Sequence, residues 1–215
     1  MPTLHGLFFN IPIGENYLGH QMSEIYRDEI YKPFVKKGIN VLDIGANLGI
    51  TTYYFSQFAG TVWSLEPSLE HFKVFEHMID HNKLKNVVPI NKAIFIDNQK
   101  LPLYHNKNRT MRSLHTAVDD KTEKPETVDC ISFDELFKQY KIKHIDLLKL
   151  DIEGTEAEVL ASEGFSKVAD KIGVVVTEVH EWSGRHPNQV REALKNNGYT
   201  VSEMPSTANI LVGKR

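Results

Sequence analysis

Residues 41–51, VLDIGANLGIT, join a short apolar run to a turn that holds two glycines. The apolar run predicts a buried strand, and Gly45 predicts a sharp turn at its end, because glycine adopts backbone angles that other residues avoid. The missing side chains at Gly45 and Gly49 also let a ligand approach the backbone N–H groups of the following helix. The stretch therefore predicts a strand–loop–helix unit of an α/β sheet.

The loop itself is compatible with a cofactor site or with a plain structural turn. It differs from the dinucleotide pattern G-x-G-x-x-G, because Asn47 and Ile50 occupy two of the glycine positions. In a structural turn, Asn47 would cap the helix or adopt a left-handed conformation. Glu66, about 20 residues after Gly45, favours a cofactor, because an acid at a strand end accepts hydrogen bonds from both ribose hydroxyls. The alternative role of Glu66 is to place a charge near the helix that follows Pro67.

Together the loop and Glu66 predict a ligand that contains a nucleoside. Both a nicotinamide dinucleotide and S-adenosylmethionine remain open at this point.

Apolar runs rich in valine and isoleucine alternate with helical patterns along the chain, at residues 39–44, 61–65, 87–95, 144–150 and 172–179. Runs that are apolar on both faces indicate a buried parallel sheet with helices on both faces. Two further strands, 199–203 and 209–213, are separated only by MPSTA, which is too short for a parallel crossover. The sequence therefore predicts an α/β fold whose seven-stranded, mostly parallel sheet ends in a C-terminal antiparallel hairpin.

Two segments flank or interrupt this pattern. Residues 20–37 have a helical pattern that Pro33 bends or ends, and we expect residues 1–37 to form a helical cover on a domain of residues 38–215. Residues 100–135 form a less regular excursion with a predicted strand at 127–132, and excursions of this length are usually functional. Four side chains in it either bind an anionic or polyhydroxyl substrate or belong to a solvated loop, which is the default: Arg109, Arg112, Ser113 and His115.

Polar side chains end the fourth and fifth predicted strands. Asp151 and Glu153 lie in KLDIEGTE, and Glu178 and His180 end the next strand. Because ligands of open α/β sheets bind at the carboxyl ends of the strands, we expect these side chains to face one cleft. Paired carboxylates at a buried strand end need a cation, a proton or donors nearby. A purely structural alternative is an ion pair between Asp151 and Lys149, which alternation places on the same face.

Composition limits the classes of function and the compartment. The formal net charge is -3, and no basic tract indicates nucleic acid or an anionic membrane as partner. A single cysteine, Cys130, rules out an internal disulfide and is typical of the cytoplasm, where we expect the protein. No apolar run predicts a membrane span, and the N-terminus lacks the pattern of a signal peptide. No H-E-x-x-H motif or Cys/His cluster indicates zinc, so no metal ligand is assigned.

Six stretches resemble, in order, the FkbM-type methyltransferases over about residues 38–182: VLDIGANLGITT, SLEPS, NKAIFID, VDCISFDELF, IDLLKLDIEGTEAEVL and VVVTEVHEW. The resemblance implies a class I, Rossmann-like fold that binds S-adenosylmethionine and usually methylates hydroxyl oxygens of sugars, glycolipids or natural products. It implies that the cofactor-binding residues are Asp43, Gly45, Asn47, Gly49, Glu66, Asn91, Ala93, Asp151 and Glu153. Among these, the loop glycines and Asn47 would lie near the methionine part, Glu66 at the ribose, and Asn91 and Ala93 at the adenine.

The same resemblance matches Asp151 to the family's acidic fourth-strand motif and Glu178 and His180 to its fifth-strand end, and we expect these three residues to be catalytic. In one route, which we prefer, His180 takes the hydroxyl proton and is oriented by Glu178. In the other, Asp151 and Glu178 hold Mg²⁺ or a similar hard cation that lowers the pKa of the bound hydroxyl.

Other classes of function fit less well. A nicotinamide-dependent oxidoreductase would need the missing third glycine, and the hairpin argues against it. A non-catalytic S-adenosylmethionine-binding module would not need Asp151, Glu153 and His180. The acidic balance argues against an RNA methyltransferase. We therefore expect a small-molecule or glycan acceptor, with no nucleic acid partner.

Overall fold

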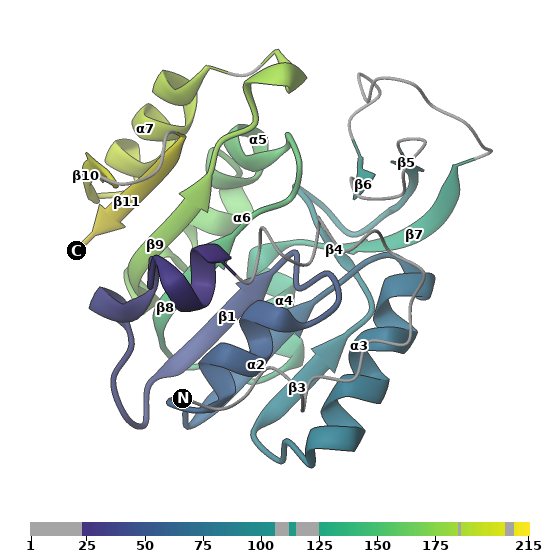
Figure 1. Ribbon diagram of the computed structural model, residues 1–215. Helices are drawn as coiled ribbons and strands as arrows, with labels where there is room; N and C mark the ends of the chain where they lie inside the picture. The colour runs from purple at the N-terminus through teal and green to yellow at the C-terminus, as the bar shows by residue number, and fades with distance from the viewer. Residues whose placement is uncertain (1–22, 106–111, 115–124, 185, 205–208) are drawn as a thin grey trace.

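The computed structural model of the chain describes residues 23–105, 112–114, 125–184, 186–204 and 209–215. Its main sheet has seven strands: β1 (Asn40–Ile44), β2 (Thr61–Leu65), β3 (Val87–Ile90), β8 (Ile145–Leu150), β9 (Ile172–Glu178), β10 (Thr200–Glu203) and β11 (Ile210–Lys214). They lie in the order β10-β11-β9-β8-β1-β2-β3 (Figure 1). The five strands from β3 to β9 are parallel, and β11 is antiparallel to both of its neighbours. The predicted mostly parallel, seven-stranded sheet is confirmed.

The C-terminal hairpin is also confirmed, and its placement adds a detail. β10 pairs with β11 from Thr200 opposite Lys214 to Glu203 opposite Leu211. The last strand, β11, inserts between β9 and β10, so that Val212 lies opposite Val176 of β9. The apolar β11 is buried over most of its length, whereas the polar β10 is largely exposed. Placing the polar strand at the edge keeps the apolar strand covered on both sides.

Helices cover both faces of the main sheet (Figure 1). One face carries α2 (Ile50–Ser56) and α3 (Leu69–Asn82). The other face carries α4 (Phe133–Gln139), α5 (Glu156–Leu160), α6 (Glu163–Ser166) and α7 (Pro187–Asn196), with a short 3-10 helix, η4 (Ala169–Lys171), before β9. No helix within the described ranges has the length and apolar character needed to cross a membrane.

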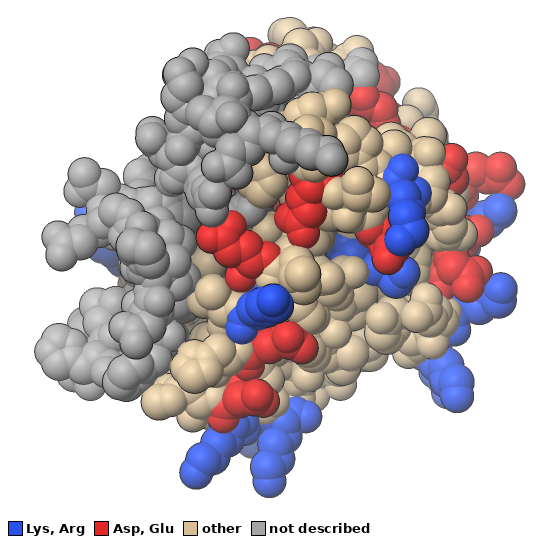
Figure 2. Space-filling model, turned by 90° about the vertical axis from the view of Figure 1, so that its right-hand side faces the viewer, with Lys and Arg blue, Asp and Glu red and all other residues tan. Residues whose placement is uncertain are grey.

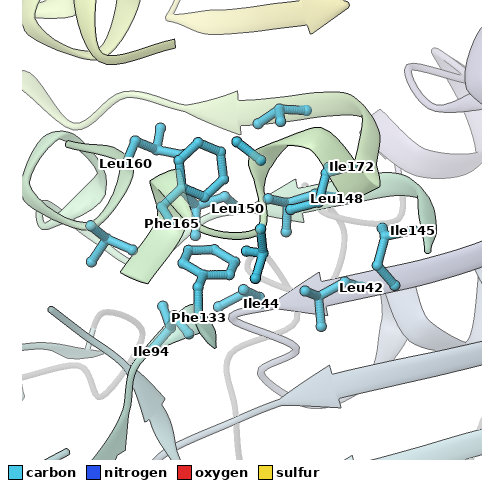
Figure 3. Close-up of a cluster of buried hydrophobic side chains, with 14 of the residues drawn as sticks. Leu42, Ile44, Ile94, Phe133, Ile145, Leu148, Leu150, Leu160, Phe165 and Ile172 are labelled. Atoms are coloured by element: carbon cyan, nitrogen blue, oxygen red, sulfur yellow. The ribbon is translucent and has the colours of Figure 1, made fainter. Parts of the chain in front are cut away.

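A hydrophobic core lies on each face of the main sheet. The strands contribute side chains to both cores, because successive side chains point to opposite faces. In β1, Leu42 and Ile44 join the core under α4 to α7, while Val41 joins the core under α2 and α3. Figure 3 shows the first of these cores, where the rings of Phe133 and Phe165 meet edge to face with centroids 5.0 Å apart.

The third apolar run does not form the single strand that was predicted over 87–95. β3 ends at Ile90, and a tight turn in which Lys92 N donates to Ile90 O at 3.0 Å redirects the chain. The following β4 (Ala93–Ile94) belongs to a second sheet, ordered β4-β7-β5-β6, with β5 (Lys100–His105), β6 (Arg112–Ser113) and β7 (Glu126–Ile131). Strands β5, β6 and β7 of this sheet lie within the excursion predicted over 100–135. Among them, β7 confirms the strand predicted at 127–132.

The second sheet is tied to the carboxyl edge of the main sheet. Ser113 is fully buried, and its hydroxyl donates a hydrogen bond to the backbone carbonyl of Glu153. Of the other polar residues predicted to act in the excursion, Arg112 lies in β6, while Arg109 and His115 lie outside the described residues.

The prediction of a helix over 20–37 is wrong within residues 23–37, the part of it that the structure describes. Only a π-helical turn, η2 (Ser23–Arg27), and a 3-10 turn, η3 (Lys32–Phe34), are formed. Glu29, between the two turns, has a φ of 51°, and Val35, directly after the second turn, is extended, so a continuous α-helix is interrupted twice. The segment nevertheless packs Ile25 and Tyr31 into the core of the same sheet face as α2 and α3.

Candidate active site

The loop between β1 and α2 has three residues with positive φ: Gly45 (83°), Asn47 (53°) and Gly49 (89°). A Cβ on Gly45 would lie 1.8 Å from the carbonyl oxygen of Asp151, and a Cβ on Gly49 would lie 2.4 Å from both Phe75 and Met78 of α3. The glycines are therefore required for the loop to pack between β8 and α3. Asn47 adopts the left-handed conformation, and the N-cap of α2 is Gly49.

Glu66 fastens this loop to the end of β2. Its side chain is buried, and its two carboxylate oxygens accept hydrogen bonds from the backbone N–H groups of Asn47 and Ser68, both at 2.9 Å. Asn91 supports the same turn from the end of β3, because its amide donates to the carbonyl oxygens of Glu66 at 2.9 Å and Pro67 at 3.0 Å. The acid at the end of β2 thus has a fixed position at the carboxyl edge of the sheet.

A pocket with about 670 Å³ of open space lies along this edge, between the loop, the end of β8 and the second sheet. Six of the predicted cofactor-binding residues line it: Gly45, Asn47, Glu66, Ala93, Asp151 and Glu153. The other three do not, because Asp43 lies below the loop, Gly49 packs on α3 and Asn91 braces the turn.

Sequence reasoning missed the apolar wall of this pocket. The second sheet contributes Ile94 and Leu103, Leu114 directly follows β6, and the first turn of α3 adds His71. Leu103 is almost completely buried, so this wall is fixed by packing before any ligand binds.

A buried ammonium group joins the loop to the end of β8. Lys149 Nζ donates to the carbonyl oxygen of Gly45 at 2.8 Å and lies 3.5 Å from Asp43 and 3.4 Å from Asp151. Asp43 is fully buried, and its other oxygen accepts a hydrogen bond from the Thr52 hydroxyl at 2.6 Å. Burial alone would lower the pKa of Lys149, but the carboxylates of Asp151 and Asp43 raise it above its ordinary value, so the ammonium stays charged.

His180 follows β9 and opens the short 3-10 helix η5 (Glu181–Ser183). Its Nδ1 lies 2.8 Å from Glu156 Oε1, and Glu156 is itself buried and accepts hydrogen bonds from Gly154 N to both oxygens at 3.1 Å. Glu178, which was expected to orient His180, lies 3.9 Å from the other ring nitrogen. Glu156 therefore orients the imidazole, and sequence reasoning gave it no role.

The other ring nitrogen, Nε2, faces three carboxylates, at 3.3 Å from Glu153, 3.7 Å from Asp151 and 3.9 Å from Glu178. Burial would lower the pKa of His180, but the hydrogen bond to Glu156 and the charges of Asp151 and Glu153 raise it to about 10. Burial and the charge of Asp151 raise the pKa of Glu153 to about 8 and that of Glu178 to about 7. A histidine with so high a pKa carries its proton at neutral pH and is a poor proton acceptor, which weakens the route with His180 as the base.

A second hollow, with about 430 Å³ of open space, lies on the other side of Asp151. The N-terminal segment contributes Glu24 and Tyr31, and the sheet contributes Glu178 and Ile210. Asp151 lines both hollows.

A sequence model of the methyltransferase FkbM domain matches residues 43–201 of the chain. A comparison with curated protein sequences gives no match. Among solved structures, the methyltransferase FkbM from Methylobacillus flagellatus KT aligns with a TM-score of 0.56 at 14% identity over 83% of this chain. A Streptococcus mutans structure in complex with SAH (S-adenosylhomocysteine) aligns at 0.52 and 12% identity over 97% of this chain and 100% of that one. An rRNA methylase from Streptococcus thermophilus aligns at 0.50 and 9% identity over 88% and 93%.

The fold and the family match define a Rossmann-like methyltransferase domain of the class that depends on S-adenosylmethionine. The matching domain model covers most of the chain, and the chain belongs to the FkbM methyltransferase family. The chain spans 44% of the length of the Methylobacillus protein.

Replacing Gly45 with alanine is expected to destabilise the fold by about 2–4 kcal/mol, because it combines a left-handed φ with a collision against the Asp151 carbonyl. Gly38→Ala is the matched control, since Gly38 has a φ of 85° but nothing within 4 Å of the added Cβ. This control should cost only about 1–2 kcal/mol, which is the cost of the left-handed conformation alone. Urea denaturation measures both, and equal losses would show that the loop does not press on Asp151.

Lys149→Met is expected to cost about 3–5 kcal/mol, because it leaves the buried Asp43 carboxylate without a counter-charge. Adding Asp43→Asn to the same chain should restore part of this loss by removing the charge. Lys195→Met, at a half-exposed surface position, serves as the control. A Lys149→Met protein as stable as the parent in urea denaturation would contradict the role of this ammonium.

Proposed function

We propose that the protein transfers the methyl group of S-adenosylmethionine to a hydroxyl oxygen of a sugar, glycolipid or natural-product acceptor. The observation that carries this proposal is the pocket at the carboxyl edge, where Glu66 and the pair Asp151 and Glu153 line one continuous space. Membership of the FkbM methyltransferase family supports the reaction class.

The side chains of the larger pocket suit the parts of this cofactor. Glu66 is placed to accept hydrogen bonds from ribose hydroxyls, and the apolar wall of Ala93, Ile94, Leu103 and Leu114 suits an adenine ring. Gly45 and Asn47 lie where the methionine part would bind, close to Asp151 and Glu153. When bound, S-adenosylmethionine supplies a methyl group made electrophilic by a positively charged sulfur, and negative side chains stabilise such a cation. Asp43, Gly49 and Asn91 act by shaping the loop and the turn.

We place the acceptor in the smaller hollow, because Asp151 borders it and the larger pocket alike. Holding two reactants in line is the main contribution of such a site. As the C–O bond forms and the C–S bond breaks, the hydroxyl proton must leave. Asp151, Glu178 and His180 face the place where this proton is released, and Glu156 keeps the imidazole in position.

The acceptor that we favour is a small molecule or a glycan. The Streptococcus thermophilus neighbour is an rRNA methylase, so RNA is the competing acceptor. On the face shown in Figure 2, lysine and arginine side chains are interspersed with aspartate and glutamate, and the net charge of the chain is -3. Binding a phosphate backbone relies on a concentrated positive surface, which the described part of that face does not present.

The cofactor is tested by adding S-adenosylhomocysteine or NADH and following the melting temperature. At about one hundred times its Kd, a ligand adds about 2.7 kcal/mol of stability, which is about 5–10 °C for a chain of this size. We expect this shift with S-adenosylhomocysteine and none with NADH. Glu66→Gln should weaken the binding at least about tenfold, whereas Glu76→Gln on the exposed side of α3 should not. Stabilisation by NADH alone would refute the methyltransferase proposal.

The acceptor is tested by transfer of a labelled methyl group to sugars, glycolipids, polyhydroxylated natural products and short RNAs. We expect label only on a non-nucleic acid acceptor, with the methyl group on oxygen in the NMR spectrum of the product. Label on RNA, or on a nitrogen, would overturn the acceptor class while leaving the cofactor assignment intact.

A further inference from the structure

We propose that Asp151, Glu178 and His180 form a binding site for a divalent first-row transition-metal ion, which binds the acceptor hydroxyl. The metal site is inferred from the geometry of these three side chains. The role of the ion in binding the acceptor hydroxyl rests on the proposed methyl transfer. The three residues come from the ends of β8 and β9, so they form no sequence motif and meet only through the fold.

The distances fit ligands that share one ion. One potential ligand atom from each residue lies within 4.8 Å of the others. His180 Nε2 is 3.7 Å from Asp151 Oδ1 and 3.9 Å from Glu178 Oε1, which is too long for hydrogen bonds. Two ligands that each lie about 2.0–2.2 Å from one metal ion are about 3–4 Å apart.

One nitrogen of the His180 ring is fixed by a carboxylate and the other is available to a metal ion, as in known metal sites. Its side chain is only 10% exposed, and the described residues give its Nε2 no hydrogen bond. Its other nitrogen is fixed by the buried Glu156 at 2.8 Å, which leaves Nε2 directed at the three carboxylates. A carboxylate that orients the far nitrogen of a ligating imidazole is the usual outer partner in metal sites.

A cation at Nε2 suits the carboxylates around it, in place of the proton that the imidazole otherwise carries. Asp151, Glu153, Glu156 and Glu178 surround the ring, and the nearest ammonium among the described residues, that of Lys149, lies against the other oxygen of Asp151 and is shared with Asp43. The Glu153 oxygen that faces Nε2 is buried and has no hydrogen bond from the described chain. A dication that replaces the imidazole proton would satisfy this oxygen and balance the carboxylates around it.

The ligand set indicates the kind of ion and leaves room for the acceptor. Mg²⁺ prefers oxygen ligands throughout, whereas an imidazole nitrogen beside two carboxylates suits a transition ion such as Mn²⁺. Three protein ligands leave coordination positions open, and the Glu178 side chain is 46% exposed beside the smaller hollow. A hydroxyl bound there would release its proton to water, and its oxygen would then form the C–O bond as the C–S bond breaks.

The test uses the full chain and Mn²⁺ alone, with free Mn²⁺ measured by electron paramagnetic resonance. We expect one bound ion, and a rise of at least tenfold in the Kd for each of Asp151→Asn, Glu178→Gln and His180→Gln. Glu156→Gln, a change at the positioning residue, should raise the Kd about tenfold. Glu163→Gln, on the exposed surface of α6, is the matched control and should leave the Kd unchanged.

Glu178→Gln is the decisive variant, because Glu178 is half-exposed and does not line the larger pocket. This variant should lose Mn²⁺ binding and keep its thermal stabilisation by S-adenosylhomocysteine. Absence of Mn²⁺ binding in the parent chain, or equal binding in Glu178→Gln and Glu163→Gln, would overturn the metal site while the cofactor test still stands. Mn²⁺ binding without stabilisation by S-adenosylhomocysteine would support the metal site and refute the methyltransferase proposal.

Discussion

A buried ammonium group sets the spacing between the two halves of the site. Lys149 Nζ contacts the Gly45 carbonyl on the cofactor loop, Asp43 under that loop and Asp151 at the end of β8. Removing charges from water is so unfavourable that the arrangement is stable only when all three partners stay in place. The end of β1 and the end of β8 are thereby locked together. The same loop is fastened to Glu66 through Asn47 N, and the other oxygen of Asp151 faces His180, so both halves of the site adjoin this ammonium group.

Much of the fold follows from local patterns in the sequence. Apolar runs on both faces predicted the parallel strands, and a connection too short for a crossover predicted the hairpin. These patterns do not give the order of the strands. In particular, they do not tell whether β10 or β11 pairs with β9. The break at Ile90 and the break at Glu29 were missed, because in both places an apolar run or a helical period continues across a backbone turn.

The candidate site was partly predictable for a similar reason. The rule that ligands bind at the carboxyl ends of strands brought Asp151, Glu178 and His180 together in advance, and the structure places them within reach of one another. Glu156 was missed, because an acid in the first turn of a helix is ordinarily an exposed partner of the helix dipole. Here the β8–α5 loop buries it against His180. A motif also cannot tell which of its residues face the ligand, as Asp43 and Gly49 show.

Asp151 borders both hollows, and among the described residues it alone appears in both linings. One of its oxygens is committed to Lys149 and the other faces His180, while the residue borders both spaces. Any charge that enters one space changes the field that the other experiences across a single carboxylate. Cofactor and acceptor would then bind with linked affinities, and by thermodynamic reciprocity each would change the affinity of the other by the same factor.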